Sequence, residues 1–233
     1  MNLQTISALA AVGLSSAQEP WLGTLPILIN EALNQIQQRR SWNCMKVPLQ
    51  FILPVTGPGP YAYALPATFK ELQSGANSLS ASSTAFFGNS IWRIFTRQEV
   101  NRLQQIGTNV SERTAFLEQS PAGIWSVNFP GPLTMGTLPP DTNFNLDTYS
   151  FLPPVVLPTD ENDLMAKYPM LVLEFTKFLM YSLGADEDSI AAKNEATAMI
   201  NGKPGGFAGY FAQASADDAS RATRGRTMRF GGF

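Results

Sequence analysis

The sequence predicts an α+β fold: helices from both ends of the chain form one bundle, which carries an inserted, proline-rich antiparallel β subdomain and an extended C-terminal tail. Apolar residues recur at helical spacing near both ends, whereas the middle alternates apolar and polar residues between prolines. The last thirty residues hold six glycines and few contiguous apolar residues. We divide the chain into N-terminal helices at 1–44, a β-rich subdomain with one short helix at 45–158, C-terminal helices at 159–203 and an extended arm at 204–233.

Two helices are expected at the N-terminal end. Asn2 is a favoured cap for the first, and Gly13 is suited to end it. Residues 6–14 are as apolar as part of a signal peptide, but no basic residue precedes them, so we expect a helix of the mature protein. The second helix should begin after Thr24, with Pro26 in its first turn. Its apolar stripe consists of Leu25, Ile29, Leu33 and Ile36. Trp42 follows as a core residue.

The middle of the chain is expected to form short strands. A strand at 46–55 should turn at the Gly-Pro-Gly-Pro run of 57–60 and pair with residues 61–65. Strands at 79–87 and 90–95 should pair around the two-residue turn Gly88-Asn89. A helix is predicted over 96–105 and a helical turn within 110–120. Further strands are expected at 124–129 and within 144–157.

Two helices are expected to return after the β subdomain. The first has a broad apolar face over residues 164–183, and Pro169 should either start its regular part or kink it. The second should run to about residue 200, with Asp186, Glu187 and Asp188 at its positive end and with Gly202 and Pro204 ending it.

Composition removes several kinds of active site. The chain has no histidine, so mechanisms that use imidazole as a base or metal ligand are excluded. Cys44 is the single cysteine and is expected to be a small buried apolar residue. Acidic clusters at 160–163 and 186–188 could be read as paired carboxylates or a metal site, but both precede helices, where negative charge is stabilising. We therefore predict no catalytic residue, no metal, no cofactor and no enzymatic activity. No run of about twenty apolar residues is present, so no membrane contact is expected.

The arm at 204–233 is the candidate binding element. Residues 203–233 carry five basic and two acidic residues, a net charge of +3, whereas residues 1–202 carry a net charge of −5. Arginine and aromatic side chains are frequent anchors of interfaces, so the arm is expected to become ordered on a partner. The predicted contact residues are Phe207, Tyr210, Phe211, Arg221, Arg224, Arg226, Arg229, Phe230 and Phe233. Contact with DNA phosphates and a solvated tail without a partner are the alternatives.

Four phrases of the sequence carry a resemblance to a known family. They are the helix and glycine of residues 3–14, the helix ending in two arginines and a tryptophan at 31–42, the Leu-Pro-Ala-Thr-Phe turn of 65–69 and the Pro-Thr-Asp start of the helical pair at 158–160. Together they resemble the head-to-tail connector adaptors of short-tailed bacteriophages, also called head completion or tail tubular (gatekeeper) proteins. The resemblance covers most of the chain.

The resemblance implies a structural virion protein at the head-to-tail interface, assembled in the host cytoplasm. It implies a ring of about twelve copies beneath the portal protein that continues the channel for viral DNA, without sequence-specific DNA binding, and receives the tail nozzle or tail fibres. The C-terminal arm would dock on the portal. Two functions of other classes stay open: a nucleic-acid-binding structural protein led by the basic tail, and a virion-associated hydrolase that uses carboxylates.

Overall fold

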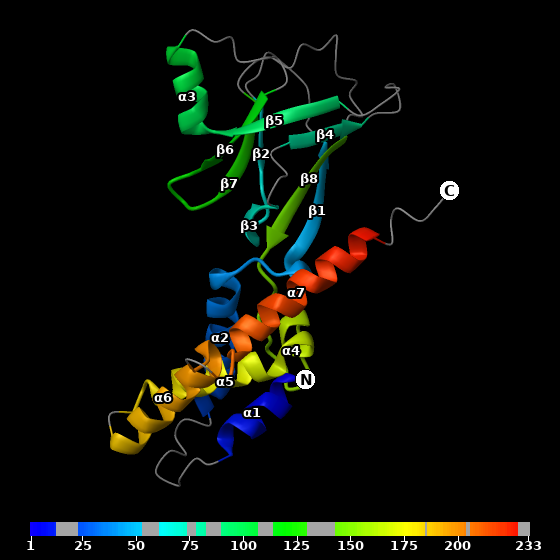
Figure 1. The fold of residues 1–233 in the computed structure, drawn as a ribbon. Coiled ribbons are helices and arrows are strands. Elements are labelled where there is room, and N and C mark those ends of the chain that lie inside the picture. The colour runs from blue at the N-terminus through cyan, green and yellow to red at the C-terminus, as the bar shows by residue number, and fades with distance from the viewer. Residues whose placement is uncertain are drawn as a thin grey trace. The chain divides into compact units, whose positions relative to one another are not determined.

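The computed structural model describes residues 1–12, 23–52, 61–73, 78–82, 90–106, 114–129, 143–184, 186–203 and 206–227. The chain divides into a helical unit, residues 1–45 with 152–233, and a β unit, residues 46–151 (Figure 1). The α+β fold is therefore confirmed, with both chain ends in one unit. The β unit ends at Phe151 instead of the predicted residue 158, because the following segment bonds to α2 (Leu25–Arg39), where Gln37 Oε1 accepts the Leu152 N–H at 2.6 Å.

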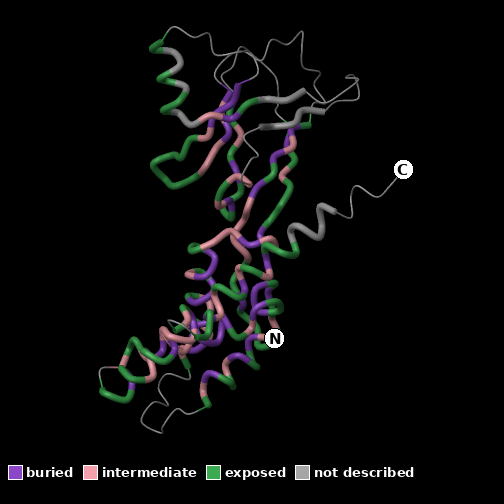
Figure 2. Tube along the Cα trace, in the orientation of Figure 1, coloured by how far each residue is buried: buried purple, intermediate pink, exposed green. Residues whose placement is uncertain are grey.

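The helical unit is built around one central helix. Its members are α1 (Leu3–Ala11), α2, the short 3-10 helix η2 (Asn43–Met45), α4 (Asp163–Lys167), α5 (Pro169–Tyr181), α6 (Glu187–Asn201) and α7 (Tyr210–Thr227). Helix α5 packs against α1, α2, α4, α6 and α7. Its buried positions include Leu171, Val172 and Phe175, and buried residues recur along the other helices of the unit (Figure 2). Helix α5, from the second half of the sequence, thus completes the core formed by α1 and α2 from the first half.

Most of the predicted helix ends are confirmed. Asn2 caps α1 by accepting the Thr5 N–H at 3.0 Å, and Asp186 caps α6 by accepting the Ser189 N–H at 2.8 Å. Pro169 starts α5, and the chain before it forms the separate short helix α4. Thr24 precedes α2 as predicted, but its side chain makes no capping hydrogen bond. The predicted stop at Gly13 lies outside the described residues.

Asn30 on α2 fixes the extended segment that leads into α4. Its amide donates to the Val155 carbonyl at 2.8 Å and accepts the Val155 N–H at 2.9 Å, while the Val155 side chain is buried. We expect Asn30→Ala to lower the free energy of unfolding by about 1–3 kcal/mol, because two backbone groups lose their partner. Asn34→Ala, on an exposed turn of the same helix, should change it by less than about 0.5 kcal/mol. Urea denaturation followed by circular dichroism measures both, and equal midpoints for the two variants would contradict the expectation.

The β unit is one mixed sheet with the strand order β1-β8-β4-β5-β6-β7-β2, and β3 pairs with β8 beside β4. The strands are β1 (Lys46–Ile52), β2 (Tyr61–Ala64), β3 (Phe69–Leu72), β4 (Ser78–Ser82), β5 (Ser90–Thr96), β6 (Thr114–Gln119), β7 (Trp125–Phe129) and β8 (Asn143–Ser150), and α3 (Arg97–Gln105) connects β5 to β6. The core is aromatic: the Phe51 ring stacks on Tyr63 at 4.1 Å and lies 5.5 Å from the Phe144 ring.

Several predicted strand pairings are wrong. β1 pairs with β8 and β2 pairs with β7, so residues 46–55 and 61–65 do not form a hairpin. The edge strands β1 and β2 meet instead through the stacked rings of Phe51 and Tyr63. β4 and β5 do pair, but Ala81 lies opposite Ser90, a register that a two-residue turn at 88–89 would not give. Residues 53–60 and 83–89, which include both predicted turns, lie outside the described residues.

Within the region predicted to hold a helical turn, residues 114–119 form strand β6. It runs parallel to β5, so the sheet is mixed instead of purely antiparallel. Thr114, Ala115 and Phe116 are buried in succession, which removes the alternation that usually identifies a strand. The predicted helix at 96–105 is confirmed as α3, and it supplies the crossover that a parallel pair needs.

The arm at 204–233 is not extended over its middle. Residues 210–227 form α7, which packs against α5, α6 and η2 (Figure 1). Five of the six glycines that suggested a flexible arm lie outside this helix in the sequence, and Gly225 lies in its last turn. Gly209 has a φ of +75° and comes so close to Gly202 that a Cβ on Gly209 would lie 2.4 Å from the Gly202 nitrogen. A tight crossing of two glycines therefore sets the start of α7.

Candidate interaction site at the C-terminal helix

The predicted contact residues fall into three groups. Tyr210 and Phe211 begin α7, and Phe207 precedes the helix, is 37% exposed and meets the Tyr210 ring edge-on at 5.2 Å. Phe211 is half-buried against Trp42, and Arg221 is exposed and bonded to Asp217 at 2.8 Å. Arg224 and Arg226 belong to α7, but their side chains are not among those described. Arg229, Phe230 and Phe233 lie outside the described residues. The structure thus places Phe207 beside Tyr210 and Phe211 beside Trp42, and it describes no side chain of the set beyond Arg221.

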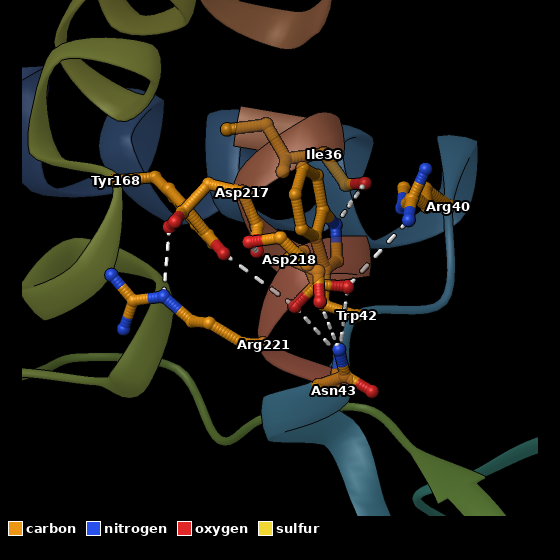
Figure 3. Close-up of polar contacts among 9 residues, drawn as sticks. Ile36, Arg40, Trp42, Asn43, Tyr168, Asp217, Asp218 and Arg221 are labelled. Atoms are coloured by element: carbon orange, nitrogen blue, oxygen red, sulfur yellow. Dashed lines mark hydrogen bonds and ion pairs between the residues drawn. The ribbon is translucent and has the colours of Figure 1, made fainter. Parts of the chain in front are cut away.

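A buried carboxylate fastens α7 to the helical unit. The side chain of Asp218 is 5% exposed, and its two oxygens accept the backbone N–H of Asn43 at 3.0 and 3.2 Å (Figure 3). Asn43 in turn donates its side-chain amide to the Asp218 carbonyl. The Tyr168 hydroxyl lies 3.5 Å from Asp218 Oδ1, and Arg40 Nη2 lies 3.6 Å from Oδ2. One residue of α7 therefore contacts the end of α2, η2 and the junction of α4 with α5.

Aromatic packing surrounds this carboxylate. Trp42 is fully buried and donates its Nε1–H to the Ile36 carbonyl at 3.2 Å. Its ring lies 5.1 Å from the Tyr168 ring and 5.8 Å from the Phe211 ring, measured between centroids. The Arg40 guanidinium lies over the Trp42 ring at 5.5 Å. These contacts keep water from the Asp218 side chain and strengthen its polar interactions.

Two ionisable side chains near the site are held in their neutral forms. Burial raises the pKa of Tyr168 to about 12, and the neighbouring Asp218 carboxylate adds to the shift, so the hydroxyl remains a donor at neutral pH. Burial also raises the pKa of the Cys44 thiol to about 11. Because the thiolate is the nucleophilic form, this shift disfavours a reactive thiol at neutral pH. The Cys44 side chain is half-buried, not fully buried as predicted.

A shallow groove of about 250 Å³ lies between α7 and the α4–α5 junction. Lys167, Tyr168 and Met170 line one side, and Tyr210, Gln213 and Asp217 line the other. Asp217 is the one carboxylate among the described residues that line it. A glycosidase needs two facing carboxylates, so this groove does not favour the hydrolase alternative.

The two acidic clusters lie at or just before helix starts: Asp160 closes the turn before α4, Asp163 lies in the first turn of α4, and Asp186 caps α6. Asp160 accepts the N–H groups of Val156 and Leu157 at 2.9 and 2.8 Å, and these bonds lower the pKa of its carboxyl group. Asp186 accepts both the N–H and the hydroxyl of Ser189, which lowers its pKa as well. Across the described ranges, no group of three or more Cys, Asp or Glu side chains is placed to hold a metal ion.

Sequence reasoning missed the residues that hold α7. Asp218, Asn43, Arg40 and Tyr168 were not candidates, although a signal for them exists. Phe211, Ala214 and Asp218 follow each other at intervals of three and four, the spacing of one helix face.

Comparison with known protein families gives no match, and no curated protein matches the sequence. None of the helices described is both long and apolar enough to cross a lipid bilayer.

Proposed function

We propose that this protein is a structural adaptor of a bacteriophage virion. It joins the portal protein to the tail nozzle or tail fibres, forms a ring with other copies of itself and continues the channel through which viral DNA passes. Its place is the head-to-tail interface, and its role is assembly without catalysis.

The architecture carries this proposal. The helices of both chain ends form one unit, and the strands lie together in one insertion between them. The resemblance to connector adaptors, of which this order of elements is a part, rests on phrases that begin in α1, in α2, in the turn before β3 and just before α4. The Leu-Pro-Ala-Thr-Phe phrase is a real turn, in which Phe69 donates its N–H to the Pro66 carbonyl at 2.9 Å.

Contact with the portal is best assigned to the chain beyond α7. The Phe211 ring already packs against Trp42, and the Arg221 side chain already forms an ion pair with Asp217, so both have partners within this chain. The last six residues carry Arg229, Phe230 and Phe233. Because α7 is fastened by Asp218, it can present these residues from a fixed base, and a ring multiplies a modest contact through avidity.

Removal of residues 228–233 tests the proposal with α7 left intact. We expect the shortened protein to lose binding to the portal protein of the same virus by about a hundredfold or more, because each copy in the ring loses one contact. Analytical size exclusion of each protein, with and without portal, measures this. Hydrogen exchange of α7 should be unchanged, which controls for folding. A deletion from residue 207 is a poorer test, since it would also uncover Trp42.

Two results would contradict this assignment. If the shortened protein binds the portal as well as the full chain does, the last six residues are not the docking element. If the full chain does not bind the portal at all but binds duplex DNA with a steep salt dependence, the nucleic-acid-binding alternative is favoured.

A further inference from the structure

The surface beneath α7 has the properties of a helix-binding site. We define the α7 acceptor surface by Arg40, Trp42, Asn43 and Tyr168, which contact one face of α7. The matching face of α7 consists of Phe211, Ala214 and Asp218. The Phe211 ring packs beside Trp42. The Asp218 carboxylate accepts the Asn43 N–H and lies near the Arg40 guanidinium. The surface therefore recognises a helix with an aromatic, a small residue and an aspartate at those intervals.

Few of the side chains described in α7 are buried. Among its side chains described, from Tyr210 to Arg221, Ala214 and Asp218 are buried and the rest are half-buried or exposed. A helix with so little buried apolar area opens at a lower free energy than the core of the unit does. By contrast, Trp42 is fully buried and Tyr168 is 7% exposed while α7 is closed. Opening of α7 therefore exposes the aromatic rings of Trp42 and Tyr168 to water, which favours binding of another helix over them.

We propose that α7 of one copy can occupy the acceptor surface of a second copy. The chain's own α7 already binds this surface, so the α7 of a second copy is the natural occupant. It offers the same Phe211 ring, the same small Ala214 and the same Asp218 carboxylate for Arg40. All contacts between helix and surface would be identical in the exchanged form. Closed and exchanged forms would then differ in the connection at 202–209 and in the entropy of association. This inference is independent of the proposed function.

Gly209 offers a way to shift this balance without touching either face. Its φ of +75° favours glycine, and an added Cβ would lie 2.5 Å from the Asn201 carbonyl carbon and 2.6 Å from the Ile200 oxygen. Gly209→Ala therefore strains the closed connection, which the exchanged form does not require. We expect the association constant of the exchanged dimer to rise about tenfold or more. Gly206→Ala is the matched control, because its Cβ would meet only the Lys203 oxygen, at 3.9 Å.

Light scattering after size exclusion and hydrogen exchange test the proposal on the full chain. For Gly209→Ala we expect a dimer in which α7 stays protected, and for Gly209→Ala combined with Asp218→Ala a monomer in which α7 exchanges rapidly. Gly206→Ala should behave as the unchanged protein. A Gly209→Ala protein that stays monomeric, whether α7 is protected or not, overturns the proposal, and so does a dimer that survives Asp218→Ala.

A pair of charge-reversed proteins tests the same idea with the connection unaltered. In Arg40→Glu and in Asp218→Lys, each chain's own α7 is mismatched with its own surface. After mixing, the α7 of the Arg40→Glu protein should bind the surface of the Asp218→Lys protein, which retains Arg40. We expect a mixed dimer in which the first protein's α7 is protected, resolved by isotope labelling of one partner. Failure to form that dimer would overturn the proposal even if Gly209→Ala does not fold.

Discussion

Replacing Trp42 with alanine is expected to lower the free energy of unfolding of the helical unit by about 3–5 kcal/mol, the cost of deleting a large buried aromatic side chain. The ring is fully buried and contacts Tyr168 from the α4–α5 junction and Phe211 from α7. Its removal leaves a cavity at the meeting point of three segments. Urea denaturation and native-state hydrogen exchange measure the loss, which should affect both α2 and α7.

Trp42→Phe is the matched control for this substitution. Phenylalanine keeps most of the ring packing but cannot donate to the Ile36 carbonyl, which accepts the indole N–H at 3.2 Å. We expect a smaller loss, about 1–2 kcal/mol, from one hydrogen bond and a small change in volume. If phenylalanine and alanine are equally destabilising, the hydrogen bond is the main contribution and the packing argument is wrong.

Replacing Asp218 with alanine is expected to weaken the docking of α7 by about 2–3 kcal/mol. The Asn43 N–H loses a charged acceptor, an interaction worth about 1.5–3 kcal/mol, and Arg40 loses its ion-pair partner. Because the Arg40 side chain is 33% exposed, its contribution is screened and we count it at less than about 1 kcal/mol. The effect should appear as faster hydrogen exchange in α7 with little change in α5, since α7 opens before the core does.

Asp217→Ala is a neighbouring control for Asp218→Ala. The Asp217 side chain is 44% exposed and forms an ion pair with Arg221 one turn along the same helix. Such pairs contribute about 0.3–0.5 kcal/mol, so the exchange of α7 should change little. Equal acceleration by both substitutions would show that general loss of negative charge, and not the buried contact of Asp218, controls the docking of α7.

Local patterns were sufficient for most of the helices. The stripe of Leu25, Ile29, Leu33 and Ile36 is buried in α2 as predicted, and the predicted cap at Asn2 forms its hydrogen bond. Asp186, predicted at the positive end of α6, caps that helix. These features depend on residues within one or two turns of each other, so a single sequence records them. The start of α5 at Pro169 follows from the same kind of local rule.

Strand partners could not be obtained in the same way. β1 pairs with β8 across about a hundred residues, with Leu49 opposite Leu146. Periodicity shows that a strand exists but not which strand lies beside it, because pairing is decided by packing of the whole sheet. β6 was missed for a different reason: its buried residues are consecutive, and its partner β5 runs parallel.

The C-terminal helix was missed because its sequence has no broad apolar stripe. Small and polar residues predominate between Tyr210 and Thr227, and glycines on both sides favoured the interpretation of a flexible arm. The stretch between Gly209 and Gly225 is free of glycine, however, and places Asp217 and Arg221 four residues apart. The docking of α7 depends on Asp218 reaching Asn43 across 175 residues, which no local pattern indicates.

The central position of α5 has a consequence for biosynthesis. The first 45 residues leave the ribosome without the helix that covers them, because α5 begins at Pro169. The whole β unit is translated between α2 and α5 and can reach its native state first. During that time the apolar side chains of Ile29 and Leu33, which are buried in the complete fold, are not covered by α5. Nascent chains stalled before Pro169 should therefore be recognised by chaperones at α1 and α2, and that exposure should end once Tyr181 has emerged.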